Sequence, residues 1–224
     1  MKLIKPKVEI LDRIDRDQVI ADITTVARTC YKSEDVRTKE KDKALVKRLI
    51  ESKHEAMLEF VDVTVKFTCS RAIAQEITRH RMASYAMESQ RYCAYNKDRF
   101  NHEITYIIPS HTNYDEGKYS LKYEVANRPF INSLLYSEKA YFDLIEDGWK
   151  AQEARDVLPN ATKTEINMKA NLREWRHFFK LRCHHTAHPD IRVLALDLLK
   201  QMHEQIPIIF DDLYDTYFTN DSEG

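Results

Sequence analysis

Alternating apolar and polar residues predict two β-strands in this chain. Residues 61–69 read VDVTVKFTC, in which every second residue is apolar. Residues 162–170 read TKTEINMKA and repeat the alternation. A period of two places one face of a strand on the core and leaves the other face for solvent or a partner. Shorter apolar runs predict further strands within residues 2–10 and at residues 104–109, where Pro109 ends the run.

Apolar residues spaced three and four positions apart predict that helices form most of the remaining chain. The predicted helices cover residues 17–31, 38–53, 129–157 in two parts that meet near Gly148, 171–183, 189–205 and the closing IPIIFDDLYDTYF run. In the second of them, Leu45, Leu49 and Ile50 should face inward. Ser70 is a suitable N-cap for another helix, which would run to about Arg79, because its hydroxyl can accept a hydrogen bond from the first turn.

We expect one α+β domain over residues 1–224. The sequence contains no internal repeat and no linker that would divide it. Long helices with a few strands favour a small, mostly antiparallel sheet that the helices surround. Residues 218–224 are mostly polar and form a predicted C-terminal tail.

The composition is that of a globular protein and excludes several classes of protein. Hydrophobic residues make up 43% of the chain, charged residues 32%, and the formal net charge is −1. No global positive field therefore favours nucleic acid, and any anion must meet a local cluster. The first residues, MKLIKPKVEILDRIDRD, are charged too early for a secretory signal, and no apolar run is long enough to span a bilayer. We expect a cytoplasmic protein that uses neither nucleic acid nor membrane as a partner.

Glycine is scarce, which limits how a nucleotide could be held. The chain has three glycines, Gly117, Gly148 and Gly224, and none lies in a cluster. This distribution excludes a Walker A loop and a GxGxxG dinucleotide fingerprint. If the protein binds a nucleotide, its side chains must hold the phosphates, and arginines are the main candidates.

Metal and disulfide chemistry are not expected. The four cysteines, Cys30, Cys69, Cys93 and Cys183, form no CxxC pair, which disfavours a zinc ribbon, a thioredoxin-like motif and a disulfide framework. His184 and His188 are four residues apart, a spacing that suits zinc on a helix face. However, Pro189 disfavours helical backbone at the preceding residue, and no HExxH-type base lies nearby. We expect no metal, and a loop between two helices at this point.

The stretch RHRMASYAMESQRY, residues 79–92, is dense in hydrogen-bonding groups. If the preceding helix continues, Ile73, Ile77 and His80 share one face and two arginines flank it. One interpretation is a core histidine beside solvated arginines. A phosphate, however, prefers guanidinium groups, hydroxyls and backbone N–H groups, all of which this stretch supplies. The residues that favour the anion site are Arg79, Arg81, Ser84, Ser89, Gln90 and Arg91.

A second polar cluster lies in NLREWRHFFKLR, residues 171–182. Asn171 and Arg182 are eleven residues apart, so a continuous helix would place them about 20° from each other. Arg173 and His177 share the opposite side, and aromatic residues lie between the two polar sides. Such a helix can serve two ligands or a subunit interface, although a helix end decorated with charges is the simpler alternative. HEAMLEF and EARDVLP indicate little by themselves.

Together these motifs resemble the flavin-dependent thymidylate synthase family, and the resemblance covers most of the chain. The four ordered motifs are HEAMLEF, Arg79-His80-Arg81 followed by seven residues and Ser89-Gln90-Arg91-Tyr92, EARDVLP, and NLREWRHFFKLR. The resemblance implies a homotetramer that binds FAD, with sites shared between subunits. It further implies conversion of dUMP to dTMP, with 5,10-methylenetetrahydrofolate as the carbon donor and NADPH as the reductant.

The resemblance also implies roles for individual residues. The flavin site would be lined by His54, Arg79, His80, Arg81, Asn171, Arg173 and His177. The dUMP site would be lined by Glu76, Arg79, Met87, Glu88, Ser89, Gln90, Arg91, Arg155 and Arg182. Arg182 would activate dUMP catalytically, because a permanent cation can stabilise negative charge on the pyrimidine. Ser89 would also act at the reacting centre, and a positioning hydroxyl suits it better than a nucleophile because no adjacent base is evident.

The chain departs from the family pattern at a few positions. Family members often read Ser-x-Asn-Glu-x-Ser, whereas this chain has Ala86 and Met87 there, and its acidic residue, Glu88, comes one place later. Glu76 stands where glutamine is common, and His177 stands where asparagine is frequent. These departures put side-chain contacts at residues 76 and 87 in doubt.

Three alternative functions would use parts of the same sequence pattern. A non-catalytic relative that binds nucleotide or flavin would keep the fold and lose the chemistry, which intact Ser89 and Arg182 disfavour. Nucleic-acid binding through residues 71–99 is disfavoured because Glu76 and Glu88 interrupt the basic patch. A zinc hydrolase would require stoichiometric metal in the purified protein.

Overall fold

The computed structural model describes residues 1–32, 37–93, 95, 97, 101–119 and 128–219. Its contacts divide the chain into two compact units. The first unit comprises residues 1–7, 67–79 and 86–166, and the second comprises residues 8–66, 80–85 and 167–224. The single domain over residues 1–224 stays a prediction. Of the predicted tail, residues 220–224 lie outside the described residues.

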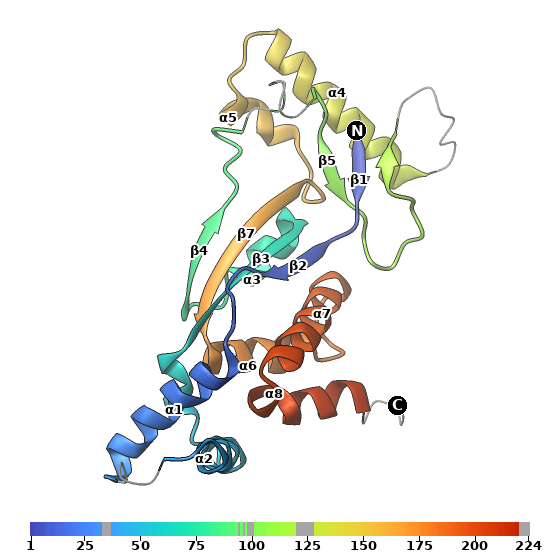
Figure 1. Ribbon diagram of the computed structural model, residues 1–224. Helices are drawn as coiled ribbons and strands as arrows, with labels where there is room; N and C mark the ends of the chain where they lie inside the picture. Colours follow the sequence, from blue (N-terminus) through green and yellow to red (C-terminus); the bar gives the residue numbers. More distant parts are fainter. Residues whose placement is uncertain (33–36, 94, 96, 98–100, 120–127, 220–224) are drawn as a thin grey trace. The chain divides into compact units, whose positions relative to one another are not determined.

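The fold combines helices and strands, which confirms the α+β class (Figure 1). The strands are β1 (Lys2–Ile4), β2 (Lys7–Ile10), β3 (Asp62–Ser70), β4 (Ala83–Met87), β5 (Thr105–Ile107), β6 (Gly117–Lys118) and β7 (Lys163–Asn171). The α-helices are α1 (Arg16–Tyr31), α2 (Lys39–Glu51), α3 (Arg71–Ile77), α4 (Pro129–Glu146), α5 (Ala151–Ala154), α6 (Leu172–Arg182), α7 (Pro189–Gln205) and α8 (Pro207–Tyr214). Two 3₁₀ helices, η1 (Glu55–Phe60) and η3 (Arg155–Val157), and a π-helical turn, η4 (Asp215–Thr219), complete the described elements.

The structure has two small sheets where the sequence predicted one. A three-stranded sheet has the order β5-β1-β6, in which β1 runs parallel to β5 and antiparallel to β6. A four-stranded sheet has the order β2-β3-β7-β4. Its strands β3 and β7 are the two that strict alternation predicted. In β7 the residues with a period of two, from Thr164 to Ala170, are buried as expected.

In the first unit, the predicted helix after Ser70 is shorter than expected. The Ser70 hydroxyl accepts a hydrogen bond from the Ile73 backbone N–H at 3.3 Å, which confirms the predicted cap. The helix nevertheless ends at Ile77, and Thr78 turns the chain by donating its hydroxyl proton to the Gln75 carbonyl at 2.9 Å. The prediction that His80 continues the apolar helix face is therefore wrong, because the chain is no longer helical there.

The core of the first unit lies under α4. Met1, Leu3, Ile104, Tyr106, Ile108, Ile131, Leu134 and Tyr141 are buried in one hydrophobic cluster. The Tyr106 hydroxyl donates to the Leu134 carbonyl at 3.3 Å, so its buried polar atom is satisfied. The N-terminal ammonium group lies 2.8 Å from Glu138, which ties β1 to α4.

The second unit is built around α6, which packs against η1, α7 and α8 (Figure 1). Trp175, Phe178 and Phe179 are fully buried on its inner side, and the Trp175 indole N–H donates to the Val63 carbonyl at 3.0 Å. Helices α1 and α2 pack against each other. In α2, Leu45 and Leu49 are buried as predicted, and Ile50 is partly buried. Among the helices in the described residues, none has both the length and the hydrophobicity that crossing a membrane requires.

Candidate functional site

Helix α6 places polar side chains on the surface of the second unit while its aromatic residues anchor it. Asn171 is its N-cap, and the side-chain oxygen accepts a hydrogen bond from the Glu174 N–H at 2.9 Å. Arg173 and His177 are exposed on the outer side. The helix continues to Arg182, whose positive charge suits the negative end of the helix dipole. The motif therefore folds as the predicted helix.

A buried arginine, which the sequence analysis missed, fixes the orientation of α6. The Arg176 guanidinium forms two hydrogen bonds with Asp212, at 2.8 and 2.7 Å, and another with Glu55 at 3.0 Å. Its side chain is 2% exposed. The sequence signal for this burial is that Arg176 directly follows Trp175 and comes two residues before Phe178, both of which are buried. A charge at such a position is stable only when it is paired.

A cavity of about 390 Å³ lies beside the outer side of α6, within the second unit. Its lining residues are Glu55, Glu59, Met82, Asn171, Arg173, Glu174, His177 and Lys180. It therefore brings together three of the residues expected at a flavin: Asn171, Arg173 and His177. The Arg173 guanidinium is paired with the Glu59 carboxylate, and Lys180 lies 3.4 Å from Glu55. An anionic ligand in this cavity must compete with these carboxylates for the cations.

His80 lies behind the cavity wall and contacts two elements of the same unit, α6 and β4. Its Nδ1 atom is 3.1 Å from the Glu174 carboxylate, and its Nε2 atom accepts a hydrogen bond from Arg182 Nε at 3.1 Å. The Tyr85 hydroxyl on β4 donates to the His80 carbonyl at 2.5 Å. The side chain is buried, and this burial, followed by electrostatic interactions with Arg182 and His177, lowers the pKa of His80 to about 4. His80 is therefore neutral at physiological pH.

The same residues have the composition of a metal site, but their hydrogen bonds favour another arrangement. Ligand atoms of His80, Glu174 and His177 all lie within 4.8 Å of one another. Because Arg182 donates to Nε2, the proton of the neutral ring is on Nδ1, which faces Glu174. A protonated nitrogen offers no lone pair to a cation, so the geometry favours a hydrogen bond between His80 and Glu174.

The two histidines with helical zinc spacing lie between α6 and α7, as predicted. His184 Nδ1 is 2.8 Å from the Thr186 hydroxyl. His188 is the N-cap of α7, and its Nδ1 accepts a hydrogen bond from the Asp190 N–H at 3.2 Å. Each ring is thus used in a local turn or cap.

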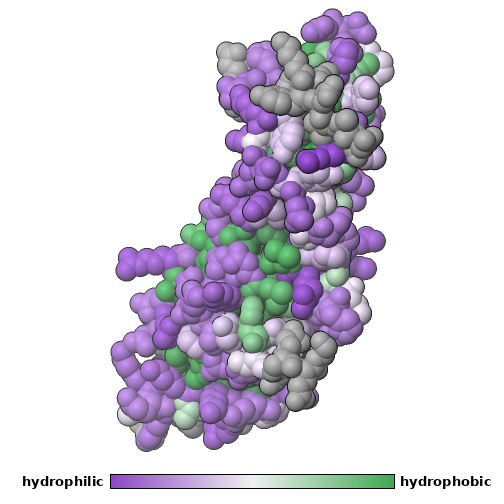
Figure 2. Space-filling view, turned by 90° about the vertical axis from the view of Figure 1, so that its right-hand side faces the viewer, coloured by the Kyte–Doolittle hydropathy of each residue, from purple (hydrophilic) through white to green (hydrophobic). Residues whose placement is uncertain are grey.

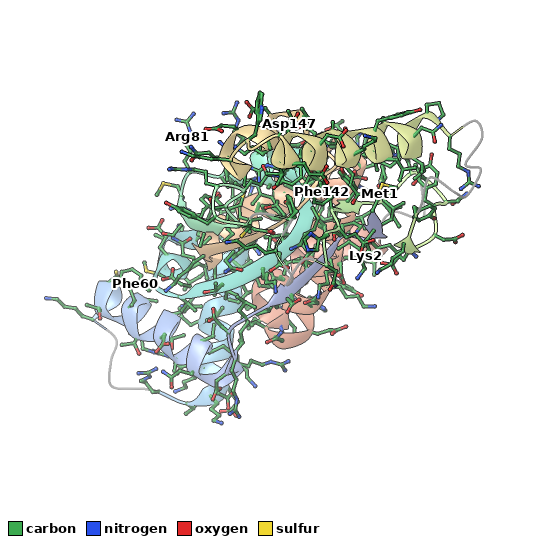
Figure 3. All side chains as sticks on the ribbon, turned by 90° about the horizontal axis from the view of Figure 1, so that it is seen from above. Met1, Lys2, Phe60, Arg81, Phe142 and Asp147 are labelled. Atoms are coloured by element: carbon green, nitrogen blue, oxygen red, sulfur yellow. The ribbon has the colours of Figure 1, made fainter. Side chains whose placement is uncertain are left out.

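Three other residues of the expected flavin set do not line this cavity. Arg79 is exposed after α3 in the first unit, and Arg81 is exposed in the second, where its side chain extends away from the ribbon (Figure 3). His54 directly precedes η1 and lies in a separate depression of about 210 Å³ beside the end of α2, with Leu45 and Leu49.

Ser89, Gln90 and Arg91, three of the residues expected at dUMP, form a turn after β4 in the first unit. The Ser89 hydroxyl accepts a hydrogen bond from the Arg91 N–H at 3.3 Å, and the Ser89 carbonyl accepts from the Cys93 N–H at 2.9 Å. Gln90 is buried, whereas Arg91 is exposed with its guanidinium 5.5 Å from the centre of the Tyr92 ring. The turn thus presents the Arg91 cation near the serine, while the backbone N–H groups of Arg91 and Cys93 are bonded within the turn.

Glu88 connects this turn to β7, which gives the shifted acidic residue a structural role. Its carboxylate lies 3.0 Å from Lys163, and its backbone N–H donates to the Glu165 carbonyl at 2.9 Å. The Met87 side chain is partly exposed, at 41%.

The remaining residues of the expected dUMP set belong to both units. Glu76 lies in the last turn of α3 and Arg155 at the start of η3, both in the first unit and both partly buried. Arg182 ends α6 in the second unit. Strand β4 and the contacts of Tyr85 and Glu174 were not found by sequence reasoning.

Residues 10–208 match a family model described as thymidylate synthase complementing protein. A flavin-dependent thymidylate synthase from Geobacter sulfurreducens is 33% identical over 199 residues, which cover 86% of this chain and 81% of that protein. Another, from Pyrococcus abyssi, is 34% identical over 171 residues, which cover 75% of this chain and 66% of that protein.

Among solved structures, a UMP/dUMP methylase from Streptomyces cacaoi, crystallised with 5-Br dUMP, has a similar fold. The TM-score is 0.76, with 97% of this chain and 98% of that chain covered. The sequence identity is 21%, so this similarity supports the fold and leaves the residue roles to be argued from the site.

Proposed function

This chain belongs to the thymidylate synthase complementing protein family, and we propose on that premise that it is a flavin-dependent thymidylate synthase converting dUMP to dTMP. The observation that carries the proposal is the outer side of α6. There Asn171, Arg173 and His177 line one cavity, and Arg182 ends the same helix. A single rigid helix would thus present both flavin-binding groups and the cation that acts on the nucleotide.

The residues at the α6 cavity fit a flavin nucleotide. Bound FAD would supply the hydride that the uracil ring receives. Arg173 suits an anionic group because its side chain is 52% exposed, and its pairing with exposed Glu59 is weak enough for a phosphate to replace. Asn171 and His177 would add hydrogen bonds. A volume of about 390 Å³ is at the small end of ligand sites, which supports completion of the site by other subunits.

Arg182 would act directly on dUMP. Its guanidinium is permanently charged and planar, and it can stabilise negative charge that develops on the pyrimidine as hydride arrives. One of its N–H groups is held by His80, which fixes its orientation. A preorganised cation of this kind needs little rearrangement during the reaction.

The turn at Ser89 would hold the nucleotide. The Ser89 oxygen accepts a local hydrogen bond from Arg91, and the hydroxyl can still donate its proton to a ligand. This geometry supports a positioning hydroxyl over a nucleophile. Exposed Arg79 and Arg91 would contact the phosphate, with Arg155 as a further cation.

We further propose that methylenetetrahydrofolate supplies the carbon, that NADPH reduces the flavin, and that the enzyme is a homotetramer. Exposed apolar side chains in the second unit support an interface between subunits: Phe60 is 65% exposed, Met82 72% and Leu181 49%. Met82 lines the α6 cavity. Hydrophobic areas also interrupt the polar surface in Figure 2, and such areas often mark protein contacts.

An anaerobic absorbance titration tests the proposal. FAD should remain with the protein after gel filtration, and NADPH should bleach its visible band. Adding dUMP with methylenetetrahydrofolate should then restore the oxidised spectrum, whereas either compound alone should not. Protein that retains and reduces FAD but never reoxidises with both substrates would instead support the non-catalytic relative.

A further inference from the structure

We propose that Glu174 is a positioning residue for the reaction: it fixes the tautomer of His80, which in turn orients the guanidinium of Arg182. The inference rests on the proposed role of Arg182 in activating dUMP. It assigns His80 a task behind the site, as the link between a carboxylate and the reacting cation.

The direction of each hydrogen bond follows from the donor at one end. Arginine cannot accept a hydrogen bond, so the 3.1 Å contact between Arg182 Nε and His80 Nε2 requires a lone pair on Nε2. A neutral imidazole then carries its proton on Nδ1. That proton points to the Glu174 carboxylate, which lies 3.1 Å away and can only accept when ionised. Arg182 therefore donates a hydrogen bond to His80, and His80 donates one to Glu174.

The surroundings hold His80 in this place, and its two hydrogen-bond partners decide the tautomer. The ring of Phe178 packs against the imidazole with centroids 4.9 Å apart, and Tyr85 holds the His80 carbonyl. The Glu174 side chain is 11% exposed, and its backbone N–H is held by the cap at Asn171. Packing fixes where the ring is, while the Glu174 acceptor at Nδ1 and the Arg182 donor at Nε2 together select which nitrogen carries the proton.

Loss of that acceptor would disturb Arg182. In the other tautomer, Nε2 carries the proton, and two donors would face each other across 3.1 Å. The guanidinium would have to turn away from His80. A small misplacement of a reacting group lowers the rate strongly, because the reaction depends on orientation.

A simpler role for Glu174 makes a different prediction. An acid in the first turn of a helix is favoured by the helix dipole, and Glu174 lies in the first turn of α6. In that role glutamine and leucine would be similarly unfavourable, because both lack the charge. In the positioning role, glutamine retains a carbonyl oxygen that accepts from Nδ1–H, and leucine does not.

The test uses the full-length, FAD-loaded protein with ¹⁵N-labelled histidine. NMR reports which ring nitrogen of His80 is protonated, with H80Q used to assign the signal. Kinetics and FAD retention are measured for wild type, E174Q and E174L. The matched control is E40L, which removes an exposed first-turn glutamate from α2.

Wild type and E174Q should show the Nδ1–H form of His80, and E174L should show a mixture of tautomers. E174L should lose kcat by roughly 10- to 100-fold while E174Q stays near wild type, with each variant saturated with FAD because Glu174 also lines the α6 cavity.

Several outcomes would overturn the proposal. They are an Nε2–H form in wild type, equal loss of kcat in E174Q and E174L, or an E174L variant as active as E40L. If E174L does not fold, the tautomer of His80 in wild type and the kcat of E174Q still test the proposed role of Glu174. A wild type that shows the Nδ1–H form but makes no dTMP would refute the proposed function, a result distinct from a wrong tautomer in an active enzyme.

Discussion

Lys163 on β7 lies between two carboxylates, with its ammonium nitrogen 3.0 Å from Glu88 and 2.9 Å from Glu165. Burial opposes its charge, but the hydrogen bonds to Glu165 and Glu88 raise the pKa of Lys163, so it stays protonated. Glu88 directly precedes the Ser89 turn. Lys163 therefore ties the proposed dUMP turn to a strand whose other end leads into α6.

Replacing Lys163 by alanine should weaken dUMP binding without loss of flavin. Without the ammonium group, two carboxylates face each other and the Ser89 turn loses its anchor. We expect KM for dUMP to rise by about three- to tenfold, the effect of roughly 1 kcal/mol. Steady-state kinetics at saturating folate measure this change. The matched control is K169A, on the same strand, where the lysine is 55% exposed; equal KM values for the two variants would refute the role of Lys163.

The Glu59→Gln variant should bind FAD more tightly than the wild type. Glu59 forms an ion pair with Arg173, and an FAD phosphate would have to displace Glu59 from this cation. Both side chains are about half exposed, so the pair is weak and the gain should be about two- to fivefold in Kd. Quenching of flavin fluorescence measures the affinity. R173A should bind FAD more weakly; a weaker affinity in E59Q would show that Glu59 supports the flavin site.

Stability should fall as the pH is lowered from about 6.5 to about 4, and His80 should account for part of this loss. The folded state lowers the pKa of His80 to about 4, so in this interval the unfolded chain binds more protons and gains stability relative to the folded one. The groups that face the ring are Glu174, His177 and Arg182, and the Tyr85 hydroxyl donates to the His80 backbone carbonyl.

The contribution of His80 should reach about 3 kcal/mol below pH 4, because one pKa unit corresponds to about 1.4 kcal/mol. Urea denaturation of wild type and H80Q across this interval measures it. The stability of H80Q should depend less on pH than that of wild type. Parallel curves for the two proteins would mean that His80 titrates normally when folded.

Replacing Arg176 by methionine should destabilise the second unit. The substitution leaves Glu55 without its 3.0 Å bond and Asp212 without two, and the Arg176 position is buried. Breaking a buried ion pair typically costs about 3–5 kcal/mol, and the half-exposed Asp212 places this case near the lower value. Urea denaturation measures the loss. K47A, which removes an exposed pair with Glu51, is the control and should be nearly neutral.

Sequence periodicity predicted those elements of the site whose pattern lies within one continuous segment. β7 and α6 follow from alternation and helical spacing, and the Ser70 cap follows from residue type. β4 was missed because its residues are mostly exposed and alternate weakly. Its strand conformation depends on pairing with β7, which is distant in sequence.

The contacts behind the site could not be predicted for the same reason. Glu174 and His80 are 94 residues apart, and nothing in either segment specifies the other as a partner. By residue type, Arg176 does not differ from the exposed arginines of its motif. Its burial depends on its partners on η1 and α8, which are distant in sequence. Residue types identified the candidate cluster, whereas tertiary packing decides which polar groups face the ligand and which support it.

The most direct test is to measure dTMP by chromatography after incubating the FAD-loaded protein with dUMP, methylenetetrahydrofolate and NADPH. We predict dTMP in wild type, none after removal of FAD, and a large loss in R182A with FAD still bound. Absence of dTMP from folded, FAD-loaded wild type with all substrates present would contradict the proposed function.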